Sequence, residues 1–209
     1  MKSLRFRFHK DRFVMVSVDG ARIPQLKLKE TTMKKTPNLF ERDWNGNKNF
    51  VTSTPNPLAD WVFKGEGVAT RKYDGTCCMF DGTTWFKRRE VKSGKKVPDD
   101  FVPVTHDPNT DKVMGWVPVN AHDKWHLVAI QNGADFESGT YELCGPKVQG
   151  NPEGFEDHVM VPHAKCEVLD APRDYDNLKE WMKTLPFEGV VFHHPDGRMA
   201  KIRRKDFDI

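Results

Sequence analysis

The feature that most constrains the fold of this sequence is a series of short strand-like segments separated by turn residues. From residue 67 onward, the segments are VATRK, TCCMF, TTWFKRR, GTYELC, GVVFHH and RMAKIRR. Turns are expected at Asp74-Gly75, Asp81-Gly82 and Pro195-Asp196-Gly197, because Asp-Gly between apolar segments is typical of tight turns. Many short strands with few helices predict an α+β fold built from antiparallel sheets.

Two short helices are expected among these strands. Residues 122–130 form one, which ends at Gly133. A second helix begins at Asp176 as its cap and ends at Pro186, with an apolar face formed by Leu178, Trp181, Met182 and Leu185. The proline-containing segment 92–112 is predicted to be a loop.

The N-terminal part of the chain has a different composition. Residues 1–36 hold ten Lys and Arg against three Asp and Glu, whereas the remainder holds 23 against 27, and the net charge is +3. Residues 4–9 and 13–18 resemble strands, with a turn at Asp19-Gly20, and residues 30–60 resemble a loop with short elements. We therefore divide the chain into a basic segment, 1–55, which can pack on the main domain, and a main domain, 56–209. The basic segment favours an anionic partner, although charge alone fits a solvated surface equally well.

Several classes of protein are disfavoured. No apolar run approaches the roughly 18 residues of a membrane-spanning helix, and the N-terminus does not resemble a signal peptide. The four cysteines include the adjacent pair Cys77-Cys78 and no CxxC pair, so neither a disulfide framework nor a zinc site is indicated. We expect an intracellular, cytoplasmic protein with reduced thiols and no membrane partner.

The main domain contains five short motifs that carry chemically useful side chains. In chain order they are Lys72-Tyr73-Asp74-Gly75, Phe86-Lys87-Arg88-Arg89-Glu90, Tyr141-Glu142-Leu143-Cys144-Gly145-Pro146, Glu188-Gly189-Val190-Val191 and Lys201-Ile202-Arg203. A lysine beside a glycine turn can be held against a nucleotide. It becomes a nucleophile when burial and neighbouring cations lower its pKa. Arg71, Lys87, Arg88 and Arg89 are the cations expected to have this effect.

In their order and spacing, these motifs resemble the covalent nucleotidyltransferase superfamily, which contains DNA ligases, RNA ligases and mRNA capping enzymes. The resemblance covers about residues 66–205. The ELCGP form and the KIRRKDF ending are most similar to the ATP-dependent RNA ligase branch. This resemblance implies a nucleotide-binding cleft between antiparallel sheets. It also implies joining of 5′-phosphate and 3′-hydroxyl RNA ends, as in RNA repair, through a lysyl-AMP and an RNA-adenylate.

The resemblance assigns a role to each matched position. Lys72 is the nucleophile that attacks the α-phosphorus of ATP, and Asp74 orients it or lies near the metal. Lys201 and Arg203 stabilise the charge on the α-phosphate. Glu188 binds Mg²⁺ or Mn²⁺.

The remaining assignments concern the nucleotide. Arg88, or its neighbour Arg89, contacts the ribose or the incoming 5′-phosphate. Glu142 accepts hydrogen bonds from the ribose hydroxyls. His163 is the expected adenine-stacking residue, from its spacing after Glu142.

The sequence departs from the superfamily pattern in two places. The last motif reads Lys-Ile-Arg where Lys-x-Lys is usual, which keeps a phosphate-binding cation. The sequence ends four residues after Lys205, so we expect no C-terminal OB-fold. Three alternatives stay open: a GTP-dependent capping guanylyltransferase, a DNA ligase, and a nucleic-acid-binding module with an inactive nucleotidyl site.

Overall fold

A computed structural model describes residues 35–108 and 110–209 in full, together with the backbone of two N-terminal strands. These strands, β1 (Arg5–His9) and β2 (Arg12–Val16), form an antiparallel hairpin in which His9 pairs with Arg12. The two strands predicted in this region are confirmed. The turn predicted at Asp19-Gly20 lies outside the described residues.

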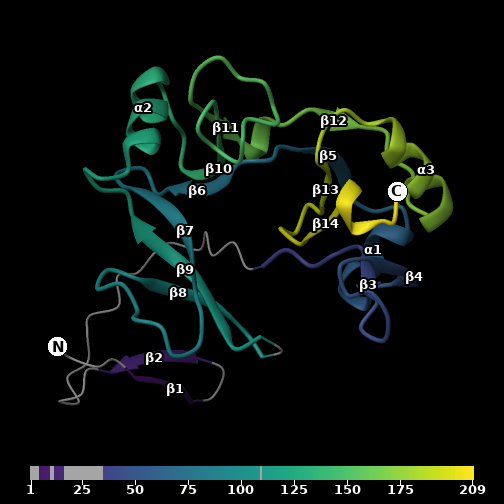
Figure 1. The fold of residues 1–209 in the computed structure, drawn as a ribbon, viewed down its shortest axis with the longest axis horizontal. Coiled ribbons are helices and arrows are strands. Elements are labelled where there is room, and N and C mark those ends of the chain that lie inside the picture. Colours follow the sequence, from purple (N-terminus) through teal and green to yellow (C-terminus); the bar gives the residue numbers. More distant parts are fainter. Residues whose placement is uncertain (1–4, 10–11, 17–34, 109) are drawn as a thin grey trace.

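The larger of the two main sheets has six antiparallel strands in the order β11-β10-β6-β7-β9-β8 (Figure 1). Its strands are β6 (Thr76–Phe80), β7 (Trp85–Val91), β8 (Val102–Asp107), β9 (Lys112–Pro118), β10 (Gly139–Cys144) and β11 (Val159–Pro162). The predicted turn at Asp81-Gly82 joins β6 to β7 as a hairpin, and Gly82 has a φ of 102°. Since left-handed backbone favours glycine, this position explains the Asp-Gly pair.

The smaller sheet has four antiparallel strands in the order β12-β5-β13-β14. These are β12 (Val168–Leu169), β5 (Val68–Lys72), β13 (Gly189–His193) and β14 (Met199–Arg203). The predicted hairpin around Pro195-Asp196-Gly197 is confirmed, because β13 pairs with β14. The segment before β3 (Phe40–Arg42) lies along the far side of β14, where Leu39 N donates to Lys201 O at 2.8 Å. β3 pairs with β4 (Val51–Pro55).

The chain crosses between the two main sheets at the Lys72–Gly75 motif. The strands predicted on either side of Asp74-Gly75 are β5 and β6, but they belong to different sheets and do not pair with each other. A Cβ atom at Gly75 would lie 2.2 Å from Leu143 O, so only glycine fits where the crossing passes β10. A second crossing runs from β11 to β12 through a short 3₁₀ helix, η2 (His163–Lys165).

The helices are short and lie outside the sheets. They are α1 (Asp60–Phe63), α2 (Lys124–Asn132) and α3 (Tyr175–Thr184), with 3₁₀ turns η1 (Pro57–Ala59) and η3 (Arg204–Asp206). Gly133 ends α2 as predicted. The predicted cap of α3 was wrong: Asp174, not Asp176, precedes the helix and accepts a hydrogen bond from Asn177 N at 3.0 Å.

The prediction of a loop over residues 92–112 holds for residues 92–101 but was wrong for the second half. β8 occupies most of its second half, and β9 begins at its last residue. Pro103 is tolerated because β8 lies at the edge of its sheet, with β9 as its single partner among the described strands, and the register shifts between Pro103 and Thr105. The prolines therefore mark an irregular edge strand, which composition alone does not separate from a loop.

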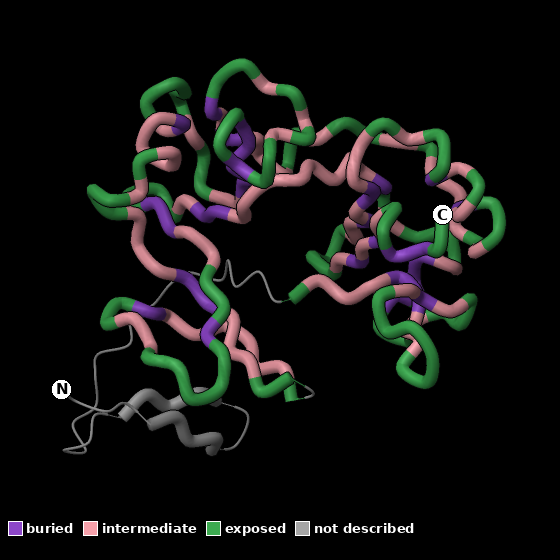
Figure 2. Tube along the Cα trace, in the orientation of Figure 1, coloured by how far each residue is buried: buried purple, intermediate pink, exposed green. Residues whose placement is uncertain are grey.

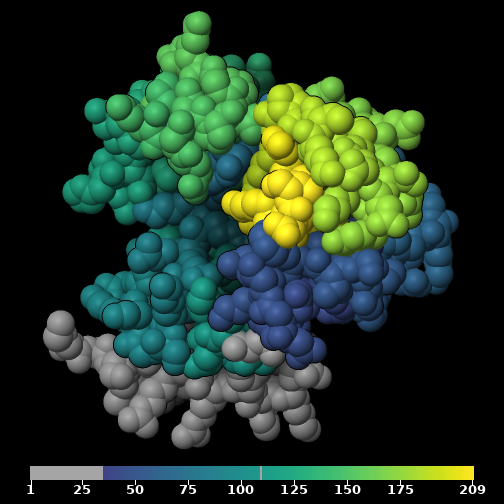
Figure 3. Space-filling model, turned by 45° about the vertical axis from the view of Figure 1, so that its right-hand side comes forward, coloured from purple at the N-terminus to yellow at the C-terminus, as the bar shows by residue number. Residues whose placement is uncertain are grey.

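Buried residues gather in separate groups around the two sheets (Figure 2). The largest group lies on the four-stranded sheet and includes Phe40, Leu178, Met182, Phe192 and Ile202. There the C-terminal end rests on the N-terminal half of the chain (Figure 3), with the Phe40 and Phe207 rings 6.5 Å apart. The predicted α+β class with antiparallel sheets is confirmed. None of the helices in the described residues is long and apolar enough to cross a membrane.

Candidate active site

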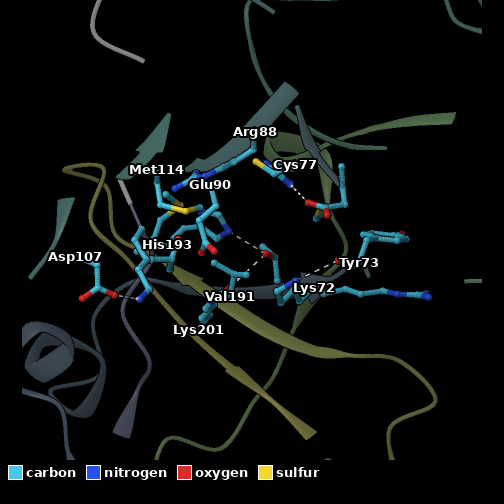
Figure 4. Close-up of a pocket in the computed structure, with 18 of the residues that line it drawn as sticks. Lys72, Tyr73, Cys77, Arg88, Glu90, Asp107, Met114, Val191, His193 and Lys201 are labelled. Carbon is cyan, nitrogen blue, oxygen red and sulfur yellow. Dashed lines mark hydrogen bonds and ion pairs between the residues drawn. The ribbon is translucent and has the colours of Figure 1, made fainter. Parts of the chain in front are cut away.

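A cavity of about 290 Å³ lies between the two main sheets and is lined by five of the eight predicted site residues. Lys72 and Lys201 line it from the four-stranded sheet and Arg88 from the six-stranded sheet (Figure 4). Glu142 also lines it from the six-stranded sheet. His163 lines it from the second crossing. Three further predicted residues are absent from the lining: Asp74, Glu188 and Arg203. Nevertheless, Glu188 forms an ion pair with Lys72, and the charges of Asp74 and Arg203 act on Lys72 and Lys201 respectively.

Lys72 is the last residue of β5 and is mostly buried. Its Nζ atom forms an ion pair with Glu188 and donates to Tyr73 O at 3.3 Å. Burial opposes its charge, but the carboxylates of Glu188, Glu142 and Asp74 outweigh burial and raise the pKa of Lys72. The expectation that neighbouring cations lower this pKa was therefore wrong for the protein without ligands. Two of those cations are paired elsewhere, Arg71 with Glu153 and Lys87 with Asp123.

Glu188 immediately precedes β13, and its partners are basic. Besides Lys72, it lies 3.9 Å from Lys205 Nζ. Burial raises the pKa of Glu188, and the neighbouring Lys72 ammonium offsets part of this effect. The carboxyl and the ammonium therefore stabilise each other's charge in a site with little access to water.

Lys201 on β14 has the opposite environment. It lines the same cavity but forms no ion pair with any of the residues that the structure describes. Burial, followed by the charges of Arg203 and Lys72, lowers the pKa of Lys201 to about 8. A half-buried ammonium without a carboxylate partner among the described residues is well suited to bind an anionic group that enters the cavity.

Arg203 lies two residues after Lys201 and is held by Asp206, which the sequence analysis did not single out. Arg203 Nε and an Nη atom donate to the two carboxylate oxygens of Asp206 at 3.0 and 2.7 Å. Arg42 also donates to Asp206 at 2.7 Å, and the carboxylate is almost fully buried. Burial acts against ionisation of Asp206, but its arginine partners hold the pKa of Asp206 below the usual value. The signal in the sequence was its place inside KIRRKDF.

Glu142 and His163 form a hydrogen-bonded pair on the opposite wall. His163 Nε2 lies 3.1 Å from a carboxylate oxygen of Glu142, and Nδ1 lies 3.0 Å from Thr140 Oγ1. Because both ring nitrogens are engaged, the imidazole is fixed in one plane at the cavity wall. This arrangement leaves the faces of the ring, rather than its edges, available for contact with a ligand.

Arg88 projects into the cavity from β7 beside Cys77 (Figure 4). Its guanidinium lies 5.4 Å from the centre of the Trp116 ring, a distance typical of a cation–π contact. Burial raises the pKa of Cys77 to about 12 and that of Cys166 to about 11. Neither cavity thiol forms a disulfide with a described residue, and both are protonated near neutral pH, so neither competes with Lys72 as a nucleophile.

Glu153, which lies outside the five motifs, binds the turn that follows Lys72. Glu153 accepts a hydrogen bond from Asp74 N at 2.8 Å and pairs with Arg71 at 2.5 Å. It comes from a loop rich in glycine and proline between β10 and β11. Glu153 lies close to the Lys72 turn only in the tertiary structure, so no sequence signal identifies it.

The described residues contain no group of three or more His, Cys, Asp or Glu side chains that could hold a metal ion by themselves. Mg²⁺, however, is usually held by one or two carboxylates together with substrate phosphates and water. Glu188, with Asp74 nearby, fits that pattern as a partner of a nucleotide-bound ion.

The fold and the cavity together are compatible with a nucleotidyltransferase-like domain: antiparallel sheets enclose a site in which lysines, an arginine and carboxylates converge. No family model matches the chain. Among curated proteins, RNA ligase 1 of Danio rerio is 28% identical over 153 residues, which is 56% of this chain and 44% of that protein. RNA ligase 1 of Pongo abelii and of Rattus norvegicus are each 25% identical over 158 residues, or 57% of this chain and 46% of theirs. The match thus spans less than half the length of these relatives, and it supports an RNA ligase family for this chain.

Proposed function

We propose that this protein is an ATP-dependent RNA ligase that joins 5′-phosphate and 3′-hydroxyl RNA ends. The observation that carries the proposal is that one cavity holds two lysines with different electrostatic environments. Lys72 stands at the turn where the chain crosses between sheets, and Lys201 is a half-buried cation without an ion-pair partner among the described residues. The similarity to proteins named RNA ligase 1 supports RNA as the substrate.

In the first step, the neutral Lys72 amine attacks the α-phosphorus of ATP. An N–P bond forms, the bond to pyrophosphate breaks, and the amine loses a proton. Lys201 and Arg203 stabilise the charge on the α-phosphate oxygens as the bond forms. The carboxylates that raise the pKa of Lys72 must be neutralised before the amine can react, and a divalent cation held by Glu188 would supply that neutralisation.

In the second step, an oxygen of the RNA 5′-phosphate attacks the phosphorus of lysyl-AMP. The N–P bond breaks, a pyrophosphate linkage forms, and Lys72 regains its proton. Arg88, which faces Lys72 across the cavity, is placed to bind the incoming phosphate. In the third step, the 3′-hydroxyl attacks the 5′-phosphorus, its proton leaves, and AMP is released as the phosphodiester forms.

The remaining cavity residues recognise the nucleoside. Glu142 is a hydrogen-bond acceptor for the ribose hydroxyls, and the ring of His163, fixed by Thr140 and Glu142, offers a face to adenine. The apolar side chains of Met114 and Val191 complete the lining and exclude water from a bound base.

The test is covalent labelling with α-labelled ATP and, separately, α-labelled GTP in the presence of Mg²⁺. We expect ATP label on the wild type, none on Lys72→Ala, and full label on Lys95→Ala, which removes an exposed lysine from a loop. Label from GTP alone would identify a capping guanylyltransferase. RNA binding without label from either nucleotide would identify a binding module and contradict the proposal.

The choice of nucleic acid is tested next with nicked RNA, single-stranded RNA and nicked DNA, each with a 5′-phosphate. Sealing of RNA, and not of DNA, is the expected result. Sealing of DNA alone would make the protein a DNA ligase.

A further inference from the structure

The loop between β10 and β11 reaches back to the turn that carries Lys72. From this loop, Glu153 contacts the chain on both sides of the lysine. One carboxylate oxygen accepts a hydrogen bond from the Arg71 side chain at 2.5 Å, and the other accepts from Asp74 N at 2.8 Å. The Glu153 side chain is only 2% exposed, so both contacts are shielded from water.

Arg71 is itself held in one position. Its guanidinium lies 4.6 Å from the centre of the Tyr73 ring and 4.8 Å from the centre of the Phe187 ring. A guanidinium held by two rings and one carboxylate has little rotational freedom. Glu153 therefore binds a rigid side chain before Lys72 and a backbone amide after it.

The loop that carries Glu153 has its own internal hydrogen bonds. The Asn151 side chain donates to Phe155 O at 3.0 Å and accepts from Phe155 N at 3.1 Å. Gly154 N donates to Asn151 O at 3.1 Å. These bonds enclose Glu153 and fix the backbone from which it projects.

We propose that Glu153 is a positioning residue that aligns Lys72 for attack on a nucleotide. The inference rests on the proposed function. Glu153 does not line the cavity, so it acts through the Lys72 turn and not by contact with substrate. Because β5 belongs to one sheet and the β10–β11 loop to the other, the contact also fixes the lysine relative to the opposite cavity wall.

This role affects the steps of the reaction unequally. Lys72 forms an N–P bond in the first step and releases it in the second. In the third step, the 3′-hydroxyl attacks an RNA-adenylate, and no bond to Lys72 is made or broken. Loss of alignment should therefore slow the first step and spare the third, whereas general damage to the fold should slow both.

The experiment compares Glu153→Ala with wild type in two single-turnover assays: labelling of the protein with α-labelled ATP, and sealing of RNA that was adenylated beforehand. We expect labelling to slow by about 100-fold, the loss that a displacement of about 1 Å can cause. Sealing should stay within about 3-fold of wild type, a margin small beside that expected loss. Glu156→Ala, an exposed carboxylate in the same loop, should change neither rate.

Glu153→Gln guards against a folding defect, because the amide keeps an acceptor for Asp74 N and loses the contact with Arg71. Its labelling rate should fall between those of wild type and Glu153→Ala. Unchanged labelling in both variants, or an equal loss in both assays, would overturn the inference while leaving the ligase proposal intact. Absence of label on the wild type itself would remove the ligase proposal.

Discussion

Strands β5 and β14 each present a lysine to the same cavity, yet the two lysines differ in electrostatic environment. At the end of β5, Lys72 is surrounded by carboxylates and its pKa is raised. On β14, Lys201 has cations as its neighbours, and burial lowers its pKa to about 8. Both lysines lie on the same sheet, but Lys72 has a carboxylate partner, and this partner makes its pKa the higher of the two.

This difference shows that motif position alone does not indicate which amine is ready to react. In the protein without ligands, the proposed nucleophile is the more firmly protonated of the two lysines. A bound nucleotide and its cation must therefore change the environment of Lys72, whereas Lys201 is already available to an anion.

The largest expected change in stability comes from the carboxylate that organises the β14 end. Asp206→Ala leaves Arg203 and Arg42 without their shared partner in a buried site. We expect the free energy of unfolding to fall by about 3–5 kcal/mol, as measured by urea titration. Asp208→Ala, an exposed residue two positions later, should change it little, and an equal loss in both variants would contradict this account.

The next largest effect is expected on the reaction when Lys201 is removed. Lys201→Ala is expected to slow self-adenylation by about 100- to 1,000-fold, as for loss of one stabilising donor in a transition state. Single-turnover labelling with ATP measures the rate, and Lys95→Ala serves as the control. A loss below about 10-fold would show that Lys201 is not the phosphate-binding cation.

The two lysines should have opposite effects on stability. Lys201→Met should raise the free energy of unfolding at pH 7, by up to about 3 kcal/mol. The folded pKa lies below the unfolded value, so Lys201 costs stability below about pH 8, and this cost disappears as the pH rises toward 10.5. The gain from the substitution should shrink over the same range.

Lys72→Met should instead lower the free energy of unfolding by about 1–3 kcal/mol, since Glu188 loses its buried partner. The stabilisation from Lys72 is fully present below the unfolded pKa of a lysine and is lost only as the pH rises through its raised folded pKa. Thermal unfolding of both variants between pH 7 and pH 10 tests the comparison, and shifts of the same sign would break it.

The smallest effect is expected at an ion pair with a largely exposed lysine that lines the same cavity. Lys35 Nζ lies 2.6 Å from an Asp107 carboxylate oxygen, but the lysine is largely exposed. Lys35→Ala should change the free energy of unfolding by less than about 1 kcal/mol, and added salt should reduce the change further. Urea titration at two salt concentrations measures this change, and a larger loss of stability would show that exposure of the lysine does not weaken the ion pair.

The sequence predicted the strands around the Asp-Gly turns, because those turns depend on local backbone geometry. Five of the eight side chains that it singled out line one cavity, since a resemblance in motif order carries tertiary information. It could not predict that β5 and β6 belong to different sheets, because Asp74-Gly75 fits a crossing between sheets as well as it fits a hairpin turn.

The contacts made by Glu153 and Asp206 were likewise beyond prediction. Glu153 lies 82 residues from its partner Arg71, and Asp206 lies 164 residues from Arg42. Such pairs depend on how whole elements pack, and an isolated carboxylate in a loop has no distinguishing pattern. The pKa of Lys72 was misjudged for the same reason, as the sequence shows its neighbouring cations but not which of them are already paired.

The two crossings between the sheets carry Lys72 and His163. A nucleotide held by both residues would connect the joints through which the chain passes from one sheet to the other. A nucleotide in the cavity would then restrict backbone motion at both crossings as well as the side chains of the site. Amide hydrogen exchange would slow at residues 73–75 and 163–167 together when a nucleotide binds, so exchange in these two peptide segments would measure occupancy of the cavity.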